Sequence, residues 1–300
     1  MDINFELYKV FYYAAKFESF SEAAQKLFIT QSAVSQSIKN LEEKLGGQLF
    51  FRKSRKVKLT WEGELLFKHV EQAYNFIKSA ENKFYEMKNL DTGEIRIGVS
   101  DTICKYFLIP HLEKFNVEHP KIKIQVINRT SSQILELLKN GLIDFGIATL
   151  PVKDKNILVK EFITVEDIFV ACHKYSALKD RKVTLRELTK YPLLMLEKNS
   201  TTRHNIDHFL EQKGVTFTPE IELEDIDLLV EFAKIGLGVA CVLKQSAFNE
   251  IEKGQLFEVE MAEKLPPRKL GICTMKNVPL SRAAAAFIEC LQRTGHSLQS

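Results

Sequence analysis

Residues 19–47 hold two amphipathic segments joined by a very short turn, and this pattern restricts the local fold more than any other in the chain. Ser19 and Glu22 form the S-x-x-E pattern of a helix N-terminus, and small or apolar residues follow at helical spacing. Thr30 can cap a second helix, which ends at the glycine pair 46–47. The apolar stripe of this second helix is Val34, Ile38, Leu41 and Leu45. Two helices so closely joined, with alanines where their axes approach, predict a helix-turn-helix.

The second helix carries a polar face that suits contact with DNA. Its exposed N-terminal positions are predicted to be Gln31, Ser32, Ser35, Gln36 and Lys39. Glutamine can form two hydrogen bonds with an adenine edge, and serine can donate or accept at a base or a phosphate. For this segment alone, an ordinary helical pair with a solvated polar face is the alternative.

A basic segment follows this helix directly and argues against that alternative. Residues 49–53 and 57–60 predict two short strands around the turn Ser54-Arg55-Lys56. Residues 31–60 carry seven Lys or Arg side chains and only two Glu. A cationic hairpin after such a helix predicts a wing that contacts the DNA backbone or minor groove.

The residues from Ala23 to Gly63 carry a family resemblance. They read A-A-x-x-L-x-x-T-Q-S-A-V-S-Q-x-I-x-x-L-E-x-x-L-G, then L-F-x-R and L-T-x-x-G, and this order closely resembles the LysR-type transcriptional regulators. The resemblance implies that residues 31, 32, 35 and 36 read bases and that Arg52 and Arg55 contact phosphates. Gln36 stands where many members have Arg or Lys, which favours adenine or water-mediated contact over guanine at this position.

Residues 61–90 predict one long helix that begins after Thr60. Its apolar residues repeat with alternating spacings of four and three, as in a heptad seam: Leu66, Val70, Ala73, Ile77, Ala80, Phe84 and Met87. The seam predicts pairing with a second copy, which would set two reading helices on a pseudo-palindromic operator. The alternative is a helix packed on its own domain. The resemblance also implies a homodimer or a homotetramer.

From residue 91 onward, strands and helices alternate, which predicts an α/β fold with parallel sheets. The predicted strands are residues 94–100, 122–127, 144–148, 168–172, 193–196, 221–223 and 239–243, with one more from Arg268 and a closing helix at 282–291. The resemblance implies a two-lobed, periplasmic-binding-protein-like effector domain. The expected organisation is a winged helix-turn-helix (1–60), a linker helix (61–90) and an effector domain (91–300). In that domain, lobe I covers about 91–162 and 267–300, and lobe II about 163–266.

Hydroxyl-rich clusters occur at three predicted helix starts of this domain. They are Ser100-Asp101-Thr102, Thr130-Ser131-Ser132 and Ser200-Thr201-Thr202-Arg203. Ligands of open α/β sheets bind beyond the carboxyl ends of the strands, although each cluster alone is equally an ordinary helix cap. Together with Arg203, the clusters predict a small anionic effector, a carboxylate or an oxyanion, whereas Asp101 could meet an ammonium group. The resemblance implies that Ser100, Thr102, Ser131, Thr201 and Thr202 line the effector pocket.

No pattern in the chain predicts catalysis, a cofactor or a metal. The five cysteines are scattered without a C-x-x-C pair, and Cys104 is expected to be a buried thiol. His204 and His208 lie four residues apart but lack a third ligand. Residues 236–239 lack the third glycine of a nucleotide loop and predict a tight helix-to-strand turn.

The composition, 45% hydrophobic and 27% charged, is that of a globular protein. With no secretory signal and no apolar run of about 18 residues, a cytoplasmic location without membrane contact is expected. A solute-binding receptor would explain residues 93–300 but not the cationic head, and an α/β enzyme with an accessory DNA-binding head is a further class. The main expectation is a sequence-specific, effector-controlled transcriptional regulator.

Overall fold

The structure is a computed structural model that describes residues 3–51, 57–88 and 93–295. Its contacts divide the chain into two compact units. The first comprises residues 1–85 with 139–141, and the second comprises the remainder.

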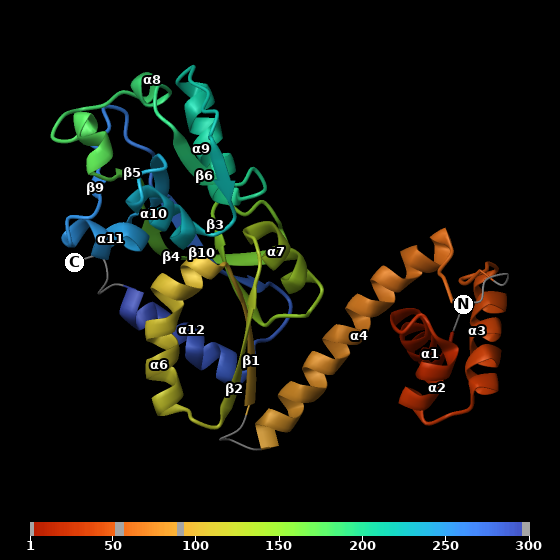
Figure 1. Cartoon of the computed structure of the whole chain (residues 1–300). Helices are drawn as coiled ribbons and strands as arrows, with labels where there is room; N and C mark the ends of the chain where they lie inside the picture. The colour runs from red at the N-terminus through yellow and green to blue at the C-terminus, as the bar shows by residue number, and fades with distance from the viewer. Residues whose placement is uncertain (1–2, 52–56, 89–92, 296–300) are drawn as a thin grey trace. The chain divides into compact units, whose positions relative to one another are not determined.

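The first unit is helical (Figure 1). Its helices are α1 (Phe5–Lys16), α2 (Phe20–Leu27), α3 (Gln31–Leu45) and α4 (Trp61–Lys88). Both predicted caps are confirmed, because Ser19 Oγ accepts from Glu22 N at 3.2 Å and Thr30 Oγ1 accepts from Ala33 N at 3.2 Å. Phe11 of α1 packs with Val34, Ile38 and Leu41 of α3 in the hydrophobic core of the first unit. Leu45, predicted to belong to the same buried stripe, is 38% exposed.

The segment after α3 begins and ends with antiparallel pairing, as expected for a wing. Phe50 and Leu59 form an antiparallel bridge, and Thr60 N donates to the Leu49 carbonyl at 2.9 Å. Buried Glu42 of α3 accepts from Leu49 N at 2.8 Å through its carboxylate, and this bond ties the wing segment to the reading helix. The predicted turn, with Arg52, Arg55 and Lys56, lies outside the described residues.

Helix α4 divides its apolar stripe between two environments. It starts at the predicted cap, where Thr60 Oγ1 accepts from Gly63 N at 3.0 Å. Leu66 and Val70 pack against the core of the first unit, so the alternative of packing on its own domain holds for this part of the helix. Further along, Ile77 is 39% and Phe84 60% exposed. The second part of the stripe is therefore more exposed than the first among the residues that the structure describes.

Lobe I of the second unit is a five-stranded sheet in the order β2-β1-β3-β10-β4. Its elements are β1 (Gly93–Val99), α5 (Asp101–Ile103), η1 (Cys104–Leu108), α6 (Ile109–Glu118), β2 (Ile122–Asn128), α7 (Ser131–Lys139), β3 (Phe145–Thr149), β4 (Ile157–Val165), β10 (Arg268–Met275) and α12 (Arg282–Gly295). Helices α6 and α12 cover one face of the sheet, and α7 covers the other (Figure 1).

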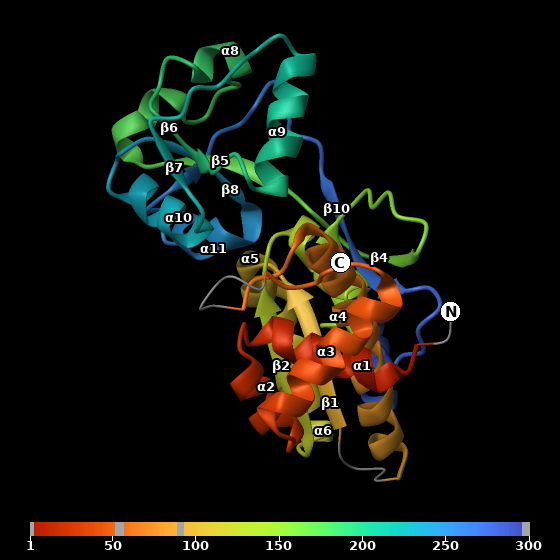
Figure 2. The same cartoon turned by 90° about the vertical axis from the view of Figure 1, so that its right-hand side faces the viewer.

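Lobe II is a second five-stranded sheet, in the order β7-β6-β8-β5-β9. Its elements are β5 (Asp167–Ala171), η2 (His173–Leu178), α8 (Leu185–Leu188), β6 (Leu193–Leu196), α9 (Thr201–Gln212), β7 (Ile221–Leu223), α10 (Ile226–Lys234), β8 (Val239–Leu243), α11 (Lys244–Glu252) and β9 (Phe257–Glu258). Helix α9 lies on one face of the sheet, opposite α10 and α11 (Figure 2). Gly236, with a φ of 79°, forms the predicted turn between α10 and β8.

The predicted parallel pairing is confirmed for β2-β1-β3 and for β7-β6-β8, but each sheet is mixed and also contains antiparallel pairs that were not predicted. Strand β10 runs antiparallel to β3 and β4, and β5 runs antiparallel to β8 and β9. The cause is the chain path, because β5 and β10 are the strands that enter each lobe from the other one. Since β4 continues to Val165, the first crossing between the lobes lies at Glu166, slightly later than expected.

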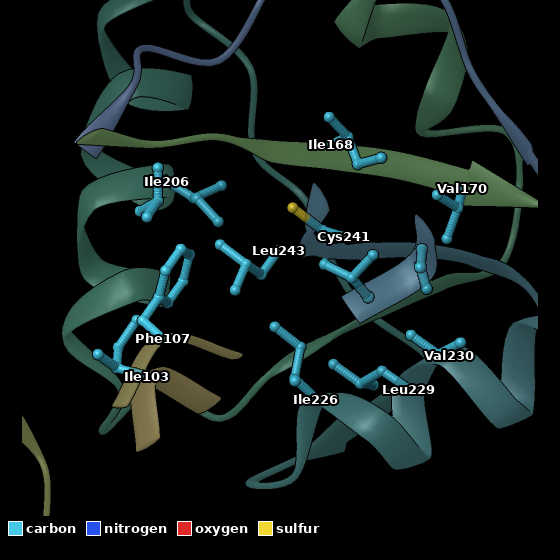
Figure 3. Packing of buried hydrophobic residues seen from close by; sticks show 14 of the residues in the cluster. Ile103, Phe107, Ile168, Val170, Ile206, Ile226, Leu229, Val230, Cys241 and Leu243 are labelled. Atoms are coloured by element: carbon cyan, nitrogen blue, oxygen red, sulfur yellow. The ribbon is translucent and has the colours of Figure 1, made fainter. Parts of the chain in front are cut away.

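One hydrophobic core runs through both lobes. Figure 3 shows Ile103 and Phe107, from lobe I, facing Ile206, Ile226 and Leu243 of lobe II. Close-packed apolar contacts therefore join the two lobes at this point.

Candidate functional site

The predicted reading face of α3 is exposed. Gln31, Ser32, Ser35, Gln36 and Lys39 are all exposed, while Val34, Ile38 and Leu41 face the core. At 100° per residue the five exposed positions cover one side of the helix. Lys39 Nζ lies 3.7 Å from a carboxylate oxygen of Glu43, in a solvent-exposed ion pair. Such a pair contributes little to stability, so Lys39 can exchange it for a phosphate.

A cavity of about 490 Å³ lies between the two lobes, and we call it the interlobe cavity. The predicted effector residues other than Arg203 line it: Ser100, Asp101, Thr102, Ser131, Thr201 and Thr202. They come from three separate helix starts, α5, α7 and α9, each of which follows a strand. The carboxyl ends of the strands thus converge, as the sequence predicts for an α/β ligand site.

The hydroxyl groups of this cavity are not all used as helix caps. Neither Ser100 nor Ser200 forms a side-chain cap bond with its helix. Ser131 Oγ accepts from Thr149 N at 3.0 Å, which ties the start of α7 to the end of β3 and keeps its own hydroxyl proton for another acceptor. Thr149 also lines the cavity. The wall therefore offers hydroxyl donors beside helix N-termini.

Arg203, predicted to favour the charge of the ligand, requires correction. Its side chain is 2% exposed and does not line the interlobe cavity. Its Nε donates to both carboxylate oxygens of Asp207 at 2.9 Å, and its Nη1 donates to Glu222 at 3.0 Å and to the Leu196 carbonyl at 2.7 Å. Burial by itself lowers the pKa of Arg203, but the bonds with Asp207 and Glu222 raise that pKa above its ordinary value. The guanidinium is thus a structural cation that fastens α9 to strands β6 and β7.

Arg268 lines the cavity instead, and sequence reasoning missed it. Its side chain is 9% exposed; its Nη2 donates to Asp167 Oδ1 at 2.7 Å, and its Nε donates to Asp167 Oδ2. Nη1 has no hydrogen-bond partner among the residues that the structure describes. No local signal could have identified this pair, because its members are about a hundred residues apart in the sequence and meet only where the two lobes join.

Other charged side chains surround the same cavity. Arg129 lines it, as do the exposed carboxylates of Asp101, Glu197 and Glu224. The buried cation thus stands among carboxylates that are open to solvent. This arrangement suits a small ligand with a negative group, and it also provides acceptors for a positive one.

A polar contact bridges the two lobes close to the cavity. Tyr106 Oη donates to Asp227 Oδ1 at 2.5 Å, and Lys105 Nζ donates to Asp227 Oδ2 at 2.8 Å. Burial, and then the bond with Asp227, raise the pKa of Tyr106 to about 12. The Tyr106 hydroxyl therefore stays protonated at neutral pH. Its bond with Asp227 joins the two lobes beside Ile226, which lines the cavity.

The weaker sequence signals have structural partners. His204 Nδ1 lies 3.0 Å from the Ser200 carbonyl, and His208 Nε2 lies 3.0 Å from Gln212 Nε2. In the described part of the chain, no group of three or more His, Cys, Asp or Glu could hold a metal ion. Cys104, predicted to be buried, is only partly buried. Its desolvation, and then the charge of Asp101, raise the pKa of its thiol, which disfavours the reactive thiolate form. Over the same described residues, no helix has the length and apolar character to cross a membrane.

Two family models match the chain. The model described as "LysR substrate binding domain" matches residues 88–295, and the one described as "Bacterial regulatory helix-turn-helix protein, lysR family" matches residues 5–64. The transcriptional activator CmpR of Synechocystis sp. is 27% identical over 95% of this chain and 93% of its own length. A probable RuBisCO transcriptional regulator of Emiliania huxleyi is 30% identical over 85% of this chain and 83% of its own length.

Solved structures share this fold. A full-length OxyR variant from Pseudomonas aeruginosa has a TM-score of 0.70 at 18% identity, covering 99% of this chain and 95% of its own. Full-length CbnR, solved in complex with its target DNA, has a TM-score of 0.67 at 16% identity, covering 97% of this chain and 100% of its own.

Proposed function

The chain belongs to the LysR family of transcriptional regulators, and we propose that a small carboxylate or oxyanion bound in the interlobe cavity controls its activity. One observation carries the proposal: the hydroxyls at three helix starts and the buried guanidinium of Arg268 line the same cavity. Hydrogen bonds to a charged ligand are about twice as strong as neutral ones. An anion at this position would accept hydrogen bonds from both the hydroxyl groups and the Arg268 guanidinium.

The ion pair with Asp167 prepares Arg268 for this role. Both bonds to Asp167 fix the plane of the guanidinium, so little side-chain freedom is lost when a ligand takes Nη1. Because Asp167 is already bound, the pair carries no net charge. The negative charge of the ligand would then be stabilised by hydrogen-bond donors that are already fixed in position, and not by an excess of positive charge.

A zwitterion is the second candidate, favoured by the three exposed carboxylates around the cavity. A ligand such as an amino acid would set its carboxylate toward Arg268 and the hydroxyls and its ammonium toward Asp101, Glu197 or Glu224. An inorganic oxyanion has no use for these carboxylates. The two candidates therefore separate on a direct comparison of ligands.

The first unit supplies the DNA contacts of the proposed regulator. We propose that the exposed face of α3 reads the operator, with Gln31 as the principal base-contacting residue and the wing as the phosphate contact. The exposed second half of α4, with Ile77 and Phe84, supports pairing into a homodimer or homotetramer. Two copies would place two reading helices on the halves of a pseudo-palindromic operator. CbnR, which shares the fold, was solved in complex with its target DNA.

Isothermal titration calorimetry of the full chain tests the effector site. The panel comprises sulfate, phosphate, small carboxylates and amino acids, and the best binder is then titrated into Thr102→Ala and Thr202→Ala. Each variant should weaken binding by about 0.5–3 kcal/mol, the upper part applying where the hydroxyl faces a charged group. The matched control is Thr216→Ala, which alters an exposed threonine outside the cavity.

Three outcomes would contradict the proposal. Equal affinity in wild type and both cavity variants would place the effector elsewhere. A best binder that is uncharged would remove the argument for Arg268. Equal loss in Thr216→Ala would mean that the affinity changes do not report on the cavity.

A further inference from the structure

A second, larger cavity lies at the segments where the chain crosses between the lobes, and we call it the hinge cavity. Its volume is about 690 Å³, against about 490 Å³ for the interlobe cavity. Its apolar walls come from the β3–β4 connection, from β4, from α9 and from the crossing segment before β10, and they include Leu150, Pro151, Val159, Phe209, Leu265 and Pro266. Pockets that bind small molecules have volumes of roughly 300–1,000 Å³ and mostly apolar walls.

The charged side chains in this wall are already paired with one another. Lys269 Nζ lies 3.0 and 2.9 Å from the two carboxylate oxygens of Glu161. Arg268 is bound by Asp167 in the buried pair described above. Two cations thus face two anions, so the hinge cavity offers a ligand no net charge.

A few other polar groups interrupt the apolar wall. Asn205, His208 and Gln212 lie along one side of α9 and line the cavity. The bond between the His208 ring and the Gln212 amide leaves the amide oxygen available to an O–H or N–H donor. Apolar walls with a small number of polar groups that fix orientation are the usual composition of a specific ligand site.

The walls of the hinge cavity are stiff. Pro151 lies in the connection between β3 and β4, and Pro266 and Pro267 lie in the crossing segment before β10. Proline fixes its own φ, so these segments lose little backbone freedom when a ligand is bound. Ligand binding would therefore cost little conformational entropy in these segments.

From these features we propose that the hinge cavity is a second ligand site, for an uncharged and largely apolar small molecule with one hydrogen-bond donor. The site stands apart from the proposed effector site, because it takes a neutral ligand where the interlobe cavity takes an anion. The two cavities nevertheless share a wall, since Arg268 lines both. Any occupant of the hinge cavity would therefore contact the same ion pair that faces the interlobe cavity.

Calorimetry of the full chain with 1-naphthol as the probe tests the proposal. The wild-type chain should bind one equivalent, and it should bind the charged analogue 1-naphthoate more weakly. In Val159→Trp the indole ring should fill the cavity and weaken 1-naphthol binding about tenfold or more. Leu158→Trp is the matched control, because Leu158 is the adjacent residue of β4, is 51% exposed and does not line the cavity.

A second pair of variants keeps the test independent of how β4 tolerates tryptophan. Gln212→Trp places the ring in the cavity from α9, whereas Glu211→Trp places it on the exposed surface next to it. Circular dichroism confirms the fold of each variant. Binding should be lost in Gln212→Trp and kept in Glu211→Trp.

Several results would overturn the proposal. No saturable heat with 1-naphthol, equal affinity in filled and control variants, or tighter binding of 1-naphthoate would each do so. If instead Val159→Trp and Gln212→Trp changed the sedimentation coefficient while 1-naphthol failed to bind, the cavity would be a contact surface between copies of this chain. Because the probe carries no charge, failure here would leave the anion proposal for the interlobe cavity untouched.

Discussion

At the scale of the residue, two arginines of the effector domain, Arg203 and Arg268, are bonded to the protein in different ways. Arg203 has all its charge taken up by Asp207 and Glu222, so it supports α9 and offers nothing to a ligand. Arg268 is bound on one side by Asp167 and keeps Nη1 for the space between the lobes. The two side chains differ in their access to the interlobe cavity, because Arg268 lines it and Arg203 does not.

The reading face of α3 gives the first prediction. Gln31→Ala should weaken binding to the specific operator by about 1–3 kcal/mol and leave binding to random DNA nearly unchanged, because a base contact carries sequence information and a phosphate contact does not. Fluorescence anisotropy with both DNAs at one salt concentration measures the difference.

The control for this prediction is Asn40→Ala, which removes an exposed amide of α3 outside the reading face. Its affinity for both DNAs should match wild type. An equal loss for operator and random DNA in Gln31→Ala would assign Gln31 to the backbone rather than to a base.

Most of the hydroxyl residues of the interlobe cavity could be predicted because they lie at helix starts that come shortly after a strand in the sequence. Thr102 and Thr202 belong to this group, and each lies beside a strand of strong apolar character. Arg268 and Thr149 could not be predicted, since their place in the cavity depends on which strands are neighbours. Arg203 was wrongly predicted to contact the ligand for the same reason. Its partner Glu222 lies on strand β7, and their contact depends on how α9 packs against the sheet.

At the scale of the element, the wing and α4 are held together by a close backbone approach. A Cβ on Gly63, in the first turn of α4, would lie 2.2 Å from the Leu49 carbonyl oxygen. That oxygen also accepts from Thr60 N, so it cannot move without breaking the pairing at the base of the wing.

Gly63→Ala should therefore destabilise the first unit by about 1–3 kcal/mol, since a methyl group placed against a fixed carbonyl forces the backbone apart. Urea unfolding measures the loss, and DNA affinity should fall with it because the wing is displaced. Gly47→Ala is the matched control, as nothing lies within 4 Å of its added Cβ. Unchanged stability in Gly63→Ala would show that the wing can shift freely.

The helices and the buried central strands could be predicted from their periods and caps. Strand β4 was missed, because most of its first five residues are exposed and its burial does not alternate regularly. Strand direction also could not be predicted from the local sequence pattern. Antiparallel β5 and β10 look like any buried strand, and only the crossing between lobes sets their orientation.

At the scale of the whole molecule, the proposed pairing through the exposed part of α4 gives a further prediction. Ile77→Glu should reduce self-association of the full chain, because it would place a charge in an apolar contact, where desolvation is costly. Analytical ultracentrifugation should show a lower sedimentation coefficient than for wild type at equal concentration. Lys68→Glu makes a charge change on the opposite side of α4, at an exposed residue, and should leave the coefficient unchanged. A wild-type coefficient for Ile77→Glu would place the contact between copies elsewhere.

The path of the chain through the two lobes also determines the order in which the strands can pair during synthesis. Strand β10 lies between β3 and β4 in the sheet of lobe I, yet all of lobe II separates it from them in the sequence. During synthesis, lobe II can complete its own sheet while β3 and β4 still wait for the strand that joins them. Until β10 arrives, the facing edges of β3 and β4 have unpaired backbone groups, which can pair with other extended chains. Lobe I is therefore the part of the nascent protein that stays longest open to misassembly, although its first strand is made before any of lobe II.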